Sequence, residues 1–209
     1  MSQQTRQGPG GGARQGAQAI TGDGAGAIET PFLTDVSTLR QRARQHIDEG
    51  AVTSSYALPT ETVVQVLNDA LATELVCVLR YKRHYFMAEG IHSESVKSEF
   101  LEHATEEQAH ADRIAERIVQ LGGEPDFSPD GLASRSHAQY VEGTTLREMI
   151  VEDLVAERIA IDSYREIAQW LGDRDSTTRK MVEEILASEE EHADDLNSLL
   201  AGMPKSEGG

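Results

Sequence analysis

Apolar residues recur at steps of three and four positions along four long segments of the chain. The segments span about residues 60–88, 93–121, 144–171 and 175–201. This spacing puts apolar side chains on one face of a helix, whereas the alternation typical of β-strands is almost absent. Thr60, Thr144 and Asp175 are suitable N-caps, and glycines follow three of the segments. The pattern predicts four helices of nearly 30 residues, each about 40 Å long.

The lengths of the connections predict how these helices are arranged. Only a few residues around Gly90 and Gly172 separate the first helix from the second and the third from the fourth. The second and third helices are instead joined by roughly twenty residues, 122–143, which include Pro125 and Pro129. Since short links join antiparallel neighbours, we expect an all-α four-helix bundle made of two antiparallel hairpins and one long crossover.

The composition of the chain divides it into four parts. Residues 1–32 are rich in glycine and glutamine and bury too little surface to offset their ordering entropy, so we expect a disordered tail. Residues 33–58 are expected to form a short helix and a linker. We expect the bundle to occupy residues 59–202 and residues 203–209 to form a flexible C-terminus.

One glutamate interrupts the apolar face of each predicted bundle helix. The four residues are Glu74, Glu107, Glu157 and Glu189. Each lies within about a residue of the midpoint of its helix, so the four carboxylates should converge in one layer of the bundle. An unpaired buried carboxylate costs several kcal/mol, and no basic residue lies on these faces at that depth. Two divalent cations would balance the four charges.

The second and fourth helices each add a histidine three residues after the glutamate, in the pairs Glu107–His110 and Glu189–His192. Side chains three apart share a helix face, so each pair can bind one metal ion. Two Glu-x-x-His pairs with two further core glutamates are typical of di-iron and di-manganese carboxylate bundles. Oxygen and imidazole ligands suit iron or manganese.

With these motifs, the segment from about residue 60 to 200 resembles the ferritin-like superfamily, in particular bacterioferritins and the Dps-like proteins that carry such a site inside each bundle. The resemblance implies terminal ligands at Glu74 and Glu157. It implies bridging ligands at Glu107 and Glu189, beside His110 and His192. It further implies a ferroxidase that binds two iron ions per subunit (manganese is the alternative), oxidises Fe²⁺ with O₂ or H₂O₂, and stores the product in a homo-oligomeric cage.

The residues around the predicted ligands carry two interpretations each. Tyr81 lies seven residues after Glu74, as does a tyrosine beside the iron in bacterioferritins. It would donate a hydrogen bond to a bridging carboxylate or supply an electron, or it would simply pack in the core. Tyr164 repeats this spacing after Glu157, and we expect a core tyrosine there. For His103 we expect a packed histidine, with a contact that supports a metal ligand as the alternative. His84 would face the cage interior or a subunit contact, and Cys77 would be a buried inert thiol. Glu190 and Asp194 would be solvated or iron-guiding carboxylates.

Two departures from the family refine these expectations. Gln108 stands where bacterioferritins place the methionine that binds haem, so no haem is expected. The sequence after the fourth helix leaves no room for the fifth helix of 24-subunit ferritins. This favours a cage of 12 subunits, with 24 as the alternative.

The formal net charge of −17 argues against a general nucleic-acid-binding protein. The first 50 residues carry equal numbers of acidic and basic side chains, so the whole excess lies in residues 51–209. A DNA-compacting Dps-type protein therefore remains only an alternative, supported by Arg40, Arg42 and Arg44. Two redox alternatives, a rubrerythrin-like peroxidase and a manganese catalase, are disfavoured by the single cysteine and the short chain. No apolar run approaches about 18 residues and no secretory signal is found, so we expect a cytoplasmic protein without a membrane partner.

Overall fold

The computed structural model describes residues 34–45, 47, 50–90 and 93–203, and within these ranges it contains helices and no strands. The predicted tail, residues 1–32, and all of the predicted flexible C-terminus except Met203 lie outside the described residues. The helix predicted within residues 33–58 is α1, Val36–Arg42, which has no buried residue. It begins after Asp35, whose carboxylate accepts a hydrogen bond from the backbone of Thr38 at 3.1 Å.

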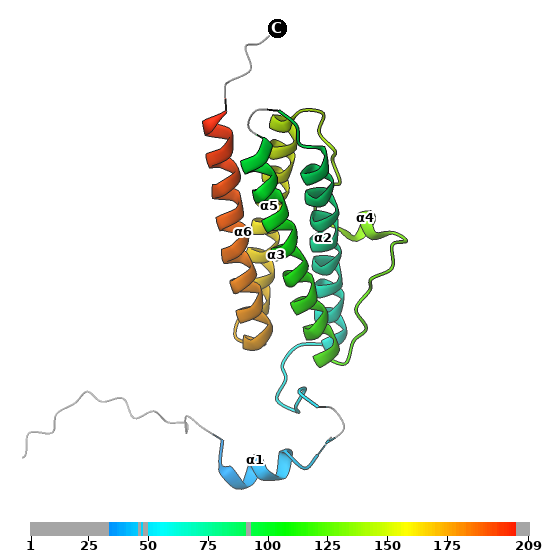
Figure 1. The fold of residues 1–209 in the computed structure, drawn as a ribbon. Coiled ribbons are helices and arrows are strands. Elements are labelled where there is room, and N and C mark those ends of the chain that lie inside the picture. Colours follow the sequence, from blue (N-terminus) through cyan, green and yellow to red (C-terminus); the bar gives the residue numbers. More distant parts are fainter. Residues whose placement is uncertain (1–33, 46, 48–49, 91–92, 204–209) are drawn as a thin grey trace, which may run out of the picture. The chain divides into compact units, whose positions relative to one another are not determined.

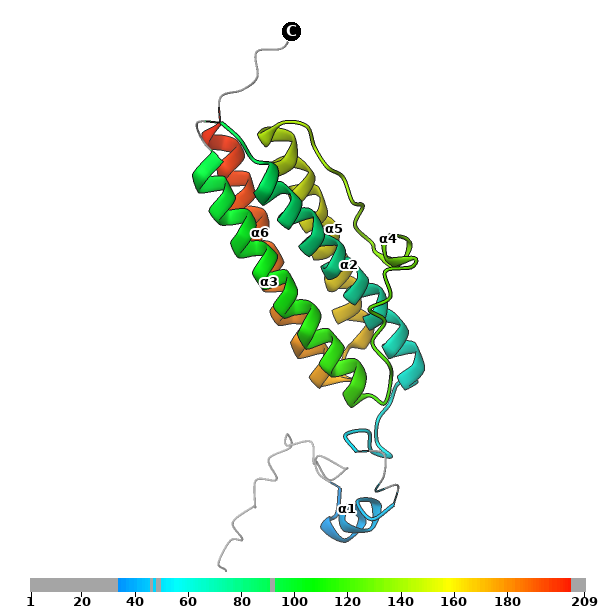
Figure 2. The same cartoon turned by 45° about the vertical axis from the view of Figure 1, so that its right-hand side comes forward.

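Four long helices form the bundle. They are α2 (Thr60–Met87), α3 (Ser93–Gln120), α5 (Leu146–Leu171) and α6 (Ser176–Gly202). Helix α2 packs mainly against α3 and α5 mainly against α6, and the two hairpins meet through α2 with α5 and α3 with α6 (Figures 1 and 2). The crossover between the hairpins runs beside α2 and contains one short helix, α4 (Leu132–Arg135), which was not predicted. The predicted all-α bundle of two hairpins and one crossover is confirmed.

The N-cap residues of two helices differ by one position from the prediction. Thr145, not Thr144, caps α5: its side chain accepts a hydrogen bond from the backbone of Glu148, whose carboxylate accepts one in return. Pro59 rather than Thr60 is the N-cap residue of α2; it makes no side-chain capping hydrogen bond, and its backbone oxygen accepts a hydrogen bond from the backbone of Val63 at 3.2 Å. At α6 the predicted cap is correct, and Asp175 accepts a hydrogen bond from the backbone of Thr178 at 2.9 Å.

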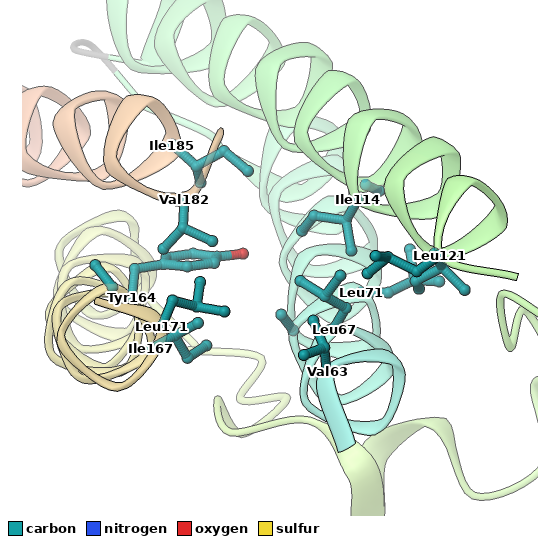
Figure 3. Packing of buried hydrophobic residues seen from close by; sticks show 14 of the residues in the cluster. Val63, Leu67, Leu71, Ile114, Leu121, Tyr164, Ile167, Leu171, Val182 and Ile185 are labelled. Carbon is teal, nitrogen blue, oxygen red and sulfur yellow. The ribbon is translucent and has the colours of Figure 1, made fainter. Parts of the chain in front are cut away.

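Two apolar clusters fill the bundle, one on each side of its middle. The first joins α2 residues up to Leu71 with α3 residues from Ala111, and Figure 3 shows these side chains facing those of α5 and α6. The second joins α2 residues from Cys77 with α3 residues up to Ala104. The layer between the clusters holds the four glutamates singled out in the sequence, Glu74, Glu107, Glu157 and Glu189, all of them buried. Their predicted convergence at one depth agrees with this arrangement.

A buried ion-pair network that was not predicted connects α2 to α5 and to the crossover. Arg80 donates to Asp153 at 2.7 Å and to the backbone oxygen of Gln139 at 3.0 Å. His84 lies 2.7 Å from Asp153 through Nδ1 and 2.9 Å from the backbone oxygen of Glu142 through Nε2. The expectation that His84 faces a cavity or a subunit contact is therefore wrong, because this side chain is fully buried inside one subunit. Arg80 is neutralised by Asp153 and so does not compensate the four glutamates.

Helix α2 alone, among the described residues, is long and apolar enough by composition to cross a membrane, although no uninterrupted apolar run of that length was found in the sequence. More than half of its apolar window, 56 %, is buried inside the protein. The helix also carries two fully buried charged residues, Glu74 and Arg80, within the bundle. These features are those of a core helix.

Candidate metal centre

The structure brings all six predicted ligands together at the middle of the bundle. Each helix contributes one glutamate from its inward face, and α3 and α6 each add a histidine one turn further on. Every one of these side chains is buried, with an exposed fraction of 7 % or less. The periodic apolar faces of the helices direct the carboxylates inward, because any other rotation of a helix would expose its apolar residues.

The six residues form two overlapping groups that could each hold a metal ion. One group consists of Glu74, Glu107, His110 and Glu189, and the other of Glu107, Glu157, Glu189 and His192. Within each group, one ligand atom from every residue lies within 4.8 Å of the others. Glu107 and Glu189 belong to both groups, whereas Glu74 and Glu157 belong to one each. This is the arrangement that two bridging and two terminal carboxylates require.

His110 directs its Nδ1 toward the ligand atoms of the first group. This nitrogen lies 3.0 Å from an oxygen of Glu189, 3.4 Å from Glu74 and 3.7 Å from Glu107. Three carboxylate oxygens around one imidazole nitrogen are more than its single N–H can serve. A cation at the centre of the group could contact all four atoms.

His192 occupies the equivalent position in the second group and is held there by a partner outside it. Its Nδ1 lies 3.5 Å from Glu107, 3.4 Å from Glu189 and 3.9 Å from Glu157. Its Nε2 lies 2.6 Å from a carboxylate oxygen of Glu106, which is half-exposed. A carboxylate on the outer nitrogen fixes the ring orientation and turns the other nitrogen toward the metal position.

The buried polar atoms that lack a hydrogen bond are concentrated at this centre. Among the described residues, nine buried side-chain nitrogen or oxygen atoms have no such partner, and seven of them are ligand atoms of the two groups. They belong to Glu74, Glu107, His110, Glu157, Glu189 and His192. Each unsatisfied buried polar atom costs about 1–3 kcal/mol. A cluster of seven fits a site whose ligand the chain itself does not supply.

The electrostatics of the centre favour protons wherever no cation neutralises the carboxylates. Burial and the neighbouring Glu107 raise the pKa of Glu74 to about 8, and burial with Glu107 and Glu189 raises that of Glu157 well above its usual range. Burial opposes charge on His110 and His192, but the nearby carboxylates of Glu107 and Glu189 raise the pKa of both imidazoles to about 12. Protons and metal ions therefore compete for the same groups.

Two tyrosines hold Glu74 and Glu157, the carboxylates that each belong to only one of the two groups. The Tyr81 hydroxyl on α2 donates to Glu157 on α5, and the Tyr164 hydroxyl on α5 donates to Glu74 on α2. Burial and the adjacent carboxylate raise the pKa of each tyrosine well above its usual value, so both keep the proton they donate. Tyr81 was expected to bond a bridging carboxylate, but it donates to Glu157, which belongs to one group only. Tyr164 combines its expected core packing with a hydrogen bond to Glu74.

His103 is buried as expected, but it also contacts the centre. Its ring stacks on that of His192 with the centroids 4.1 Å apart, and its Nδ1 lies 3.2 Å from the Tyr81 hydroxyl oxygen. Burial and the neighbouring His192 lower the pKa of His103 to about 3. The one signal for this role in the sequence is the position of His103 one helical turn before Glu107. For Glu106, which bonds His192, the sequence holds no such signal beyond its place next to Glu107.

The remaining residues singled out in the sequence belong to neither group of ligands. Gln108 donates to Asp112 at 2.9 Å on its own helix. Glu190 pairs with Arg165 at 3.0 Å on the surface, and Asp194 is exposed. Cys77 is buried, and burial raises the pKa of its thiol, which fits the inert role expected for it.

Comparison with known proteins agrees with this architecture. A family model described as a ferritin-like domain matches residues 64–206. The nutrient stress-induced DNA-binding protein of Nostoc sp. is 34 % identical over 81 % of this chain and 92 % of that protein, and the bacterioferritin of Mycobacterium leprae is 31 % identical over 68 % and 85 %. A solved structure of a dodecameric thioferritin from Bacteroides fragilis, described as bacterioferritin-related, is 34 % identical over 69 % of this chain and 87 % of that one, with a TM-score of 0.67. As its glutamates and histidines predicted, the chain belongs to the ferritin-like domain family.

Proposed function

We propose that this protein oxidises and stores iron. In this proposal two Fe²⁺ ions bind at the middle of the bundle, are oxidised to Fe³⁺ by O₂ or H₂O₂, and the product is retained in a cage of 12 copies of the chain. The observation that carries the proposal is the set of seven buried ligand atoms without hydrogen bonds, divided between two groups that share Glu107 and Glu189. Family membership supports iron as the metal.

The chemistry of the six side chains suits this substrate. Four carboxylates balance the charge of two Fe²⁺ ions and attract Fe³⁺ more strongly, which favours the oxidised product. Each Fe²⁺ gives up one electron, so a pair supplies the two electrons that, with two protons, convert O₂ to H₂O₂ or H₂O₂ to two water molecules. Holding both ions between shared carboxylates lets one oxidant accept both electrons at one place.

The proposed cage rests on the relatives and on the surface of the bundle. The Bacteroides fragilis thioferritin, at 34 % identity, is a dodecamer. In this chain, Leu79, Phe86 and Met87 on α2 are each at least half exposed. Large apolar side chains gathered on one helix are typical of a surface that another protein copy covers.

A second candidate function, DNA binding, is favoured by one observation. The Nostoc sp. relative that matches 81 % of this chain is named a DNA-binding protein. The net charge of −17 opposes such binding, and the basic residues that could contribute to it are Arg40, Arg42 and Arg44. We expect a gel shift with duplex DNA only at low salt, since contacts limited to phosphates weaken steeply as salt rises. A shift that persists at moderate salt would show that DNA binding is a genuine second function.

The first prediction for iron chemistry concerns the shared ligand Glu107 and the histidine His192. Glu107→Ala or His192→Ala should lower the rate of Fe²⁺ oxidation by at least about 100-fold, the upper range for groups that merely support a ligand. Stopped-flow absorbance of the Fe³⁺ product measures the rate, and circular dichroism should show unchanged helices. Glu190→Ala is the matched control, because Glu190 follows Glu189 but is half-exposed and lies outside both groups. Unchanged oxidation in both ligand variants would refute the proposal.

The second prediction concerns the two tyrosines. Tyr81→Phe and Tyr164→Phe should each weaken binding of one metal ion by about 10- to 100-fold, because each hydroxyl holds one terminal carboxylate in place. Titration with Mn²⁺ under anaerobic conditions measures the two affinities. If Tyr81→Phe instead slows oxidation while both affinities stay unchanged, Tyr81 acts as an electron donor and the positioning role is wrong.

The third prediction concerns stability and pH in the metal-free protein. Folding raises the pKa of Glu74 from 4.5 to about 8 and of His110 and His192 from 6.5 to about 12. The folded state thus binds protons more tightly than the unfolded state, so its stability must fall as pH rises through this range. The pKa values of Glu107 and Glu189 are lowered instead, which affects stability only below about pH 4.5.

We therefore expect the unfolding temperature of the metal-free protein to fall between pH 6 and 9. Loading with Mn²⁺ should remove or reverse this fall, because metal ions displace the protons and bind more tightly as pH rises. Differential scanning calorimetry of the metal-free and the Mn²⁺-loaded protein measures both unfolding temperatures. A metal-free protein that gains stability over this range would contradict the prediction.

A further inference from the structure

A third group of possible metal ligands lies outside the two groups at the bundle centre. It consists of Glu99 and His103, one turn apart on α3, and Asp195 on α6, with ligand atoms within 4.8 Å of one another. His103 Nε2 lies 3.5 Å from an oxygen of Glu99 and 4.0 Å from one of Asp195. These distances are too long for hydrogen bonds, but they suit three atoms that surround one ion.

The hydrogen bonds of His103 determine which of its nitrogens is free. Tyr81 has a single hydroxyl proton and donates it to Glu157, so its oxygen accepts the hydrogen bond from His103 Nδ1 at 3.2 Å. In a neutral imidazole, Nε2 then carries a lone pair instead of a proton. His103 is only 2 % exposed, and none of the hydrogen bonds found in the described part of the chain involves Nε2.

This lone pair points toward two carboxylates. A lone pair on a nearly buried imidazole, beside two negative oxygens, is unfavourable unless a positive charge lies between them. Two carboxylates balance one divalent cation, and an imidazole nitrogen with carboxylate oxygens is a ligand set that zinc, iron and manganese accept. We propose that Glu99, His103 and Asp195 bind a third divalent cation beside the buried centre.

The exposure of this site differs from that of the centre. The side chains of Glu99 and Asp195 are 28 % and 47 % exposed, whereas none of the six central ligands exceeds 7 %. A cation bound here keeps part of its water shell and exchanges with solvent. His103 forms the inner wall of the site and stacks directly on His192 of the centre. The site is thus placed to hold Fe²⁺ before it enters the centre, a use that rests on the proposed function although cation binding does not.

Zinc titration of the full chain tests the proposal, because Zn²⁺ is not oxidised and accepts all three ligand types. Isothermal titration calorimetry should give three Zn²⁺ per chain, and anomalous diffraction from zinc-soaked crystals should place the third ion at Glu99, His103 and Asp195. Asp195→Asn or Glu99→Gln should lower the number to two and remove the third anomalous peak only. Asp194→Asn and Glu102→Gln, exposed positions on the same helices, are the matched controls and should keep three.

Four outcomes decide between the third site and the proposed function. Two Zn²⁺ per chain in the unaltered protein, with no peak beside His103, overturns the third site and leaves the proposed function untouched. Retention of three ions with unchanged affinity in Asp195→Asn and Glu99→Gln also overturns it. A third peak that persists in Glu107→Ala, a variant of the centre, supports a separate site. If that third site is present while the unaltered protein fails to oxidise Fe²⁺, the proposed function alone is wrong.

Discussion

The constraint on which this bundle depends is the burial of four carboxylates in a single layer. Four carboxyl groups and two histidines with seven unsatisfied ligand atoms would destabilise an ordinary core. The layer is tolerated because an apolar cluster packs on each side of it, so the four helices are held together from both ends of the bundle. The Arg80–Asp153 pair and His84 add a further connection between α2, α5 and the crossover.

In this arrangement the geometry of the site does not depend on bound metal ions. The backbone positions of the glutamates are set by apolar packing, and the side chains are set by hydrogen bonds from outside the two groups. Tyr81, Tyr164 and Glu106 each form a hydrogen bond to one ligand and lie outside the two groups. A site held in this way loses little entropy when ions bind, and it keeps its geometry when ions leave.

Much of this architecture could be predicted because the same periodicity that defines a helix also reveals its exceptions. A glutamate such as Glu74 stands out on the apolar face of a helix, and the nearly equal lengths of the four helices place four such residues at one depth. Glu106 could not be found in this way, since a half-exposed acidic residue on a helix is ordinary. The buried pair of Arg80 and Asp153 could not be predicted, because the charge of each residue is compensated by the other and the two lie 73 positions apart in the chain. The cap of α5 was misplaced by one residue because Thr144 and Thr145 are chemically equivalent in sequence.

The two tyrosine bonds have a consequence for how such a centre can be assembled. Each hairpin carries one terminal glutamate, one Glu-x-x-His pair and a tyrosine seven residues after its terminal glutamate, but each tyrosine bonds the glutamate of the other hairpin. Neither half therefore contains a finished site. Two identical copies of one hairpin, related by a two-fold axis, would supply every group that the single chain now provides. The centre has the internal symmetry of a dimer, and the long crossover is the covalent link that a dimer would lack.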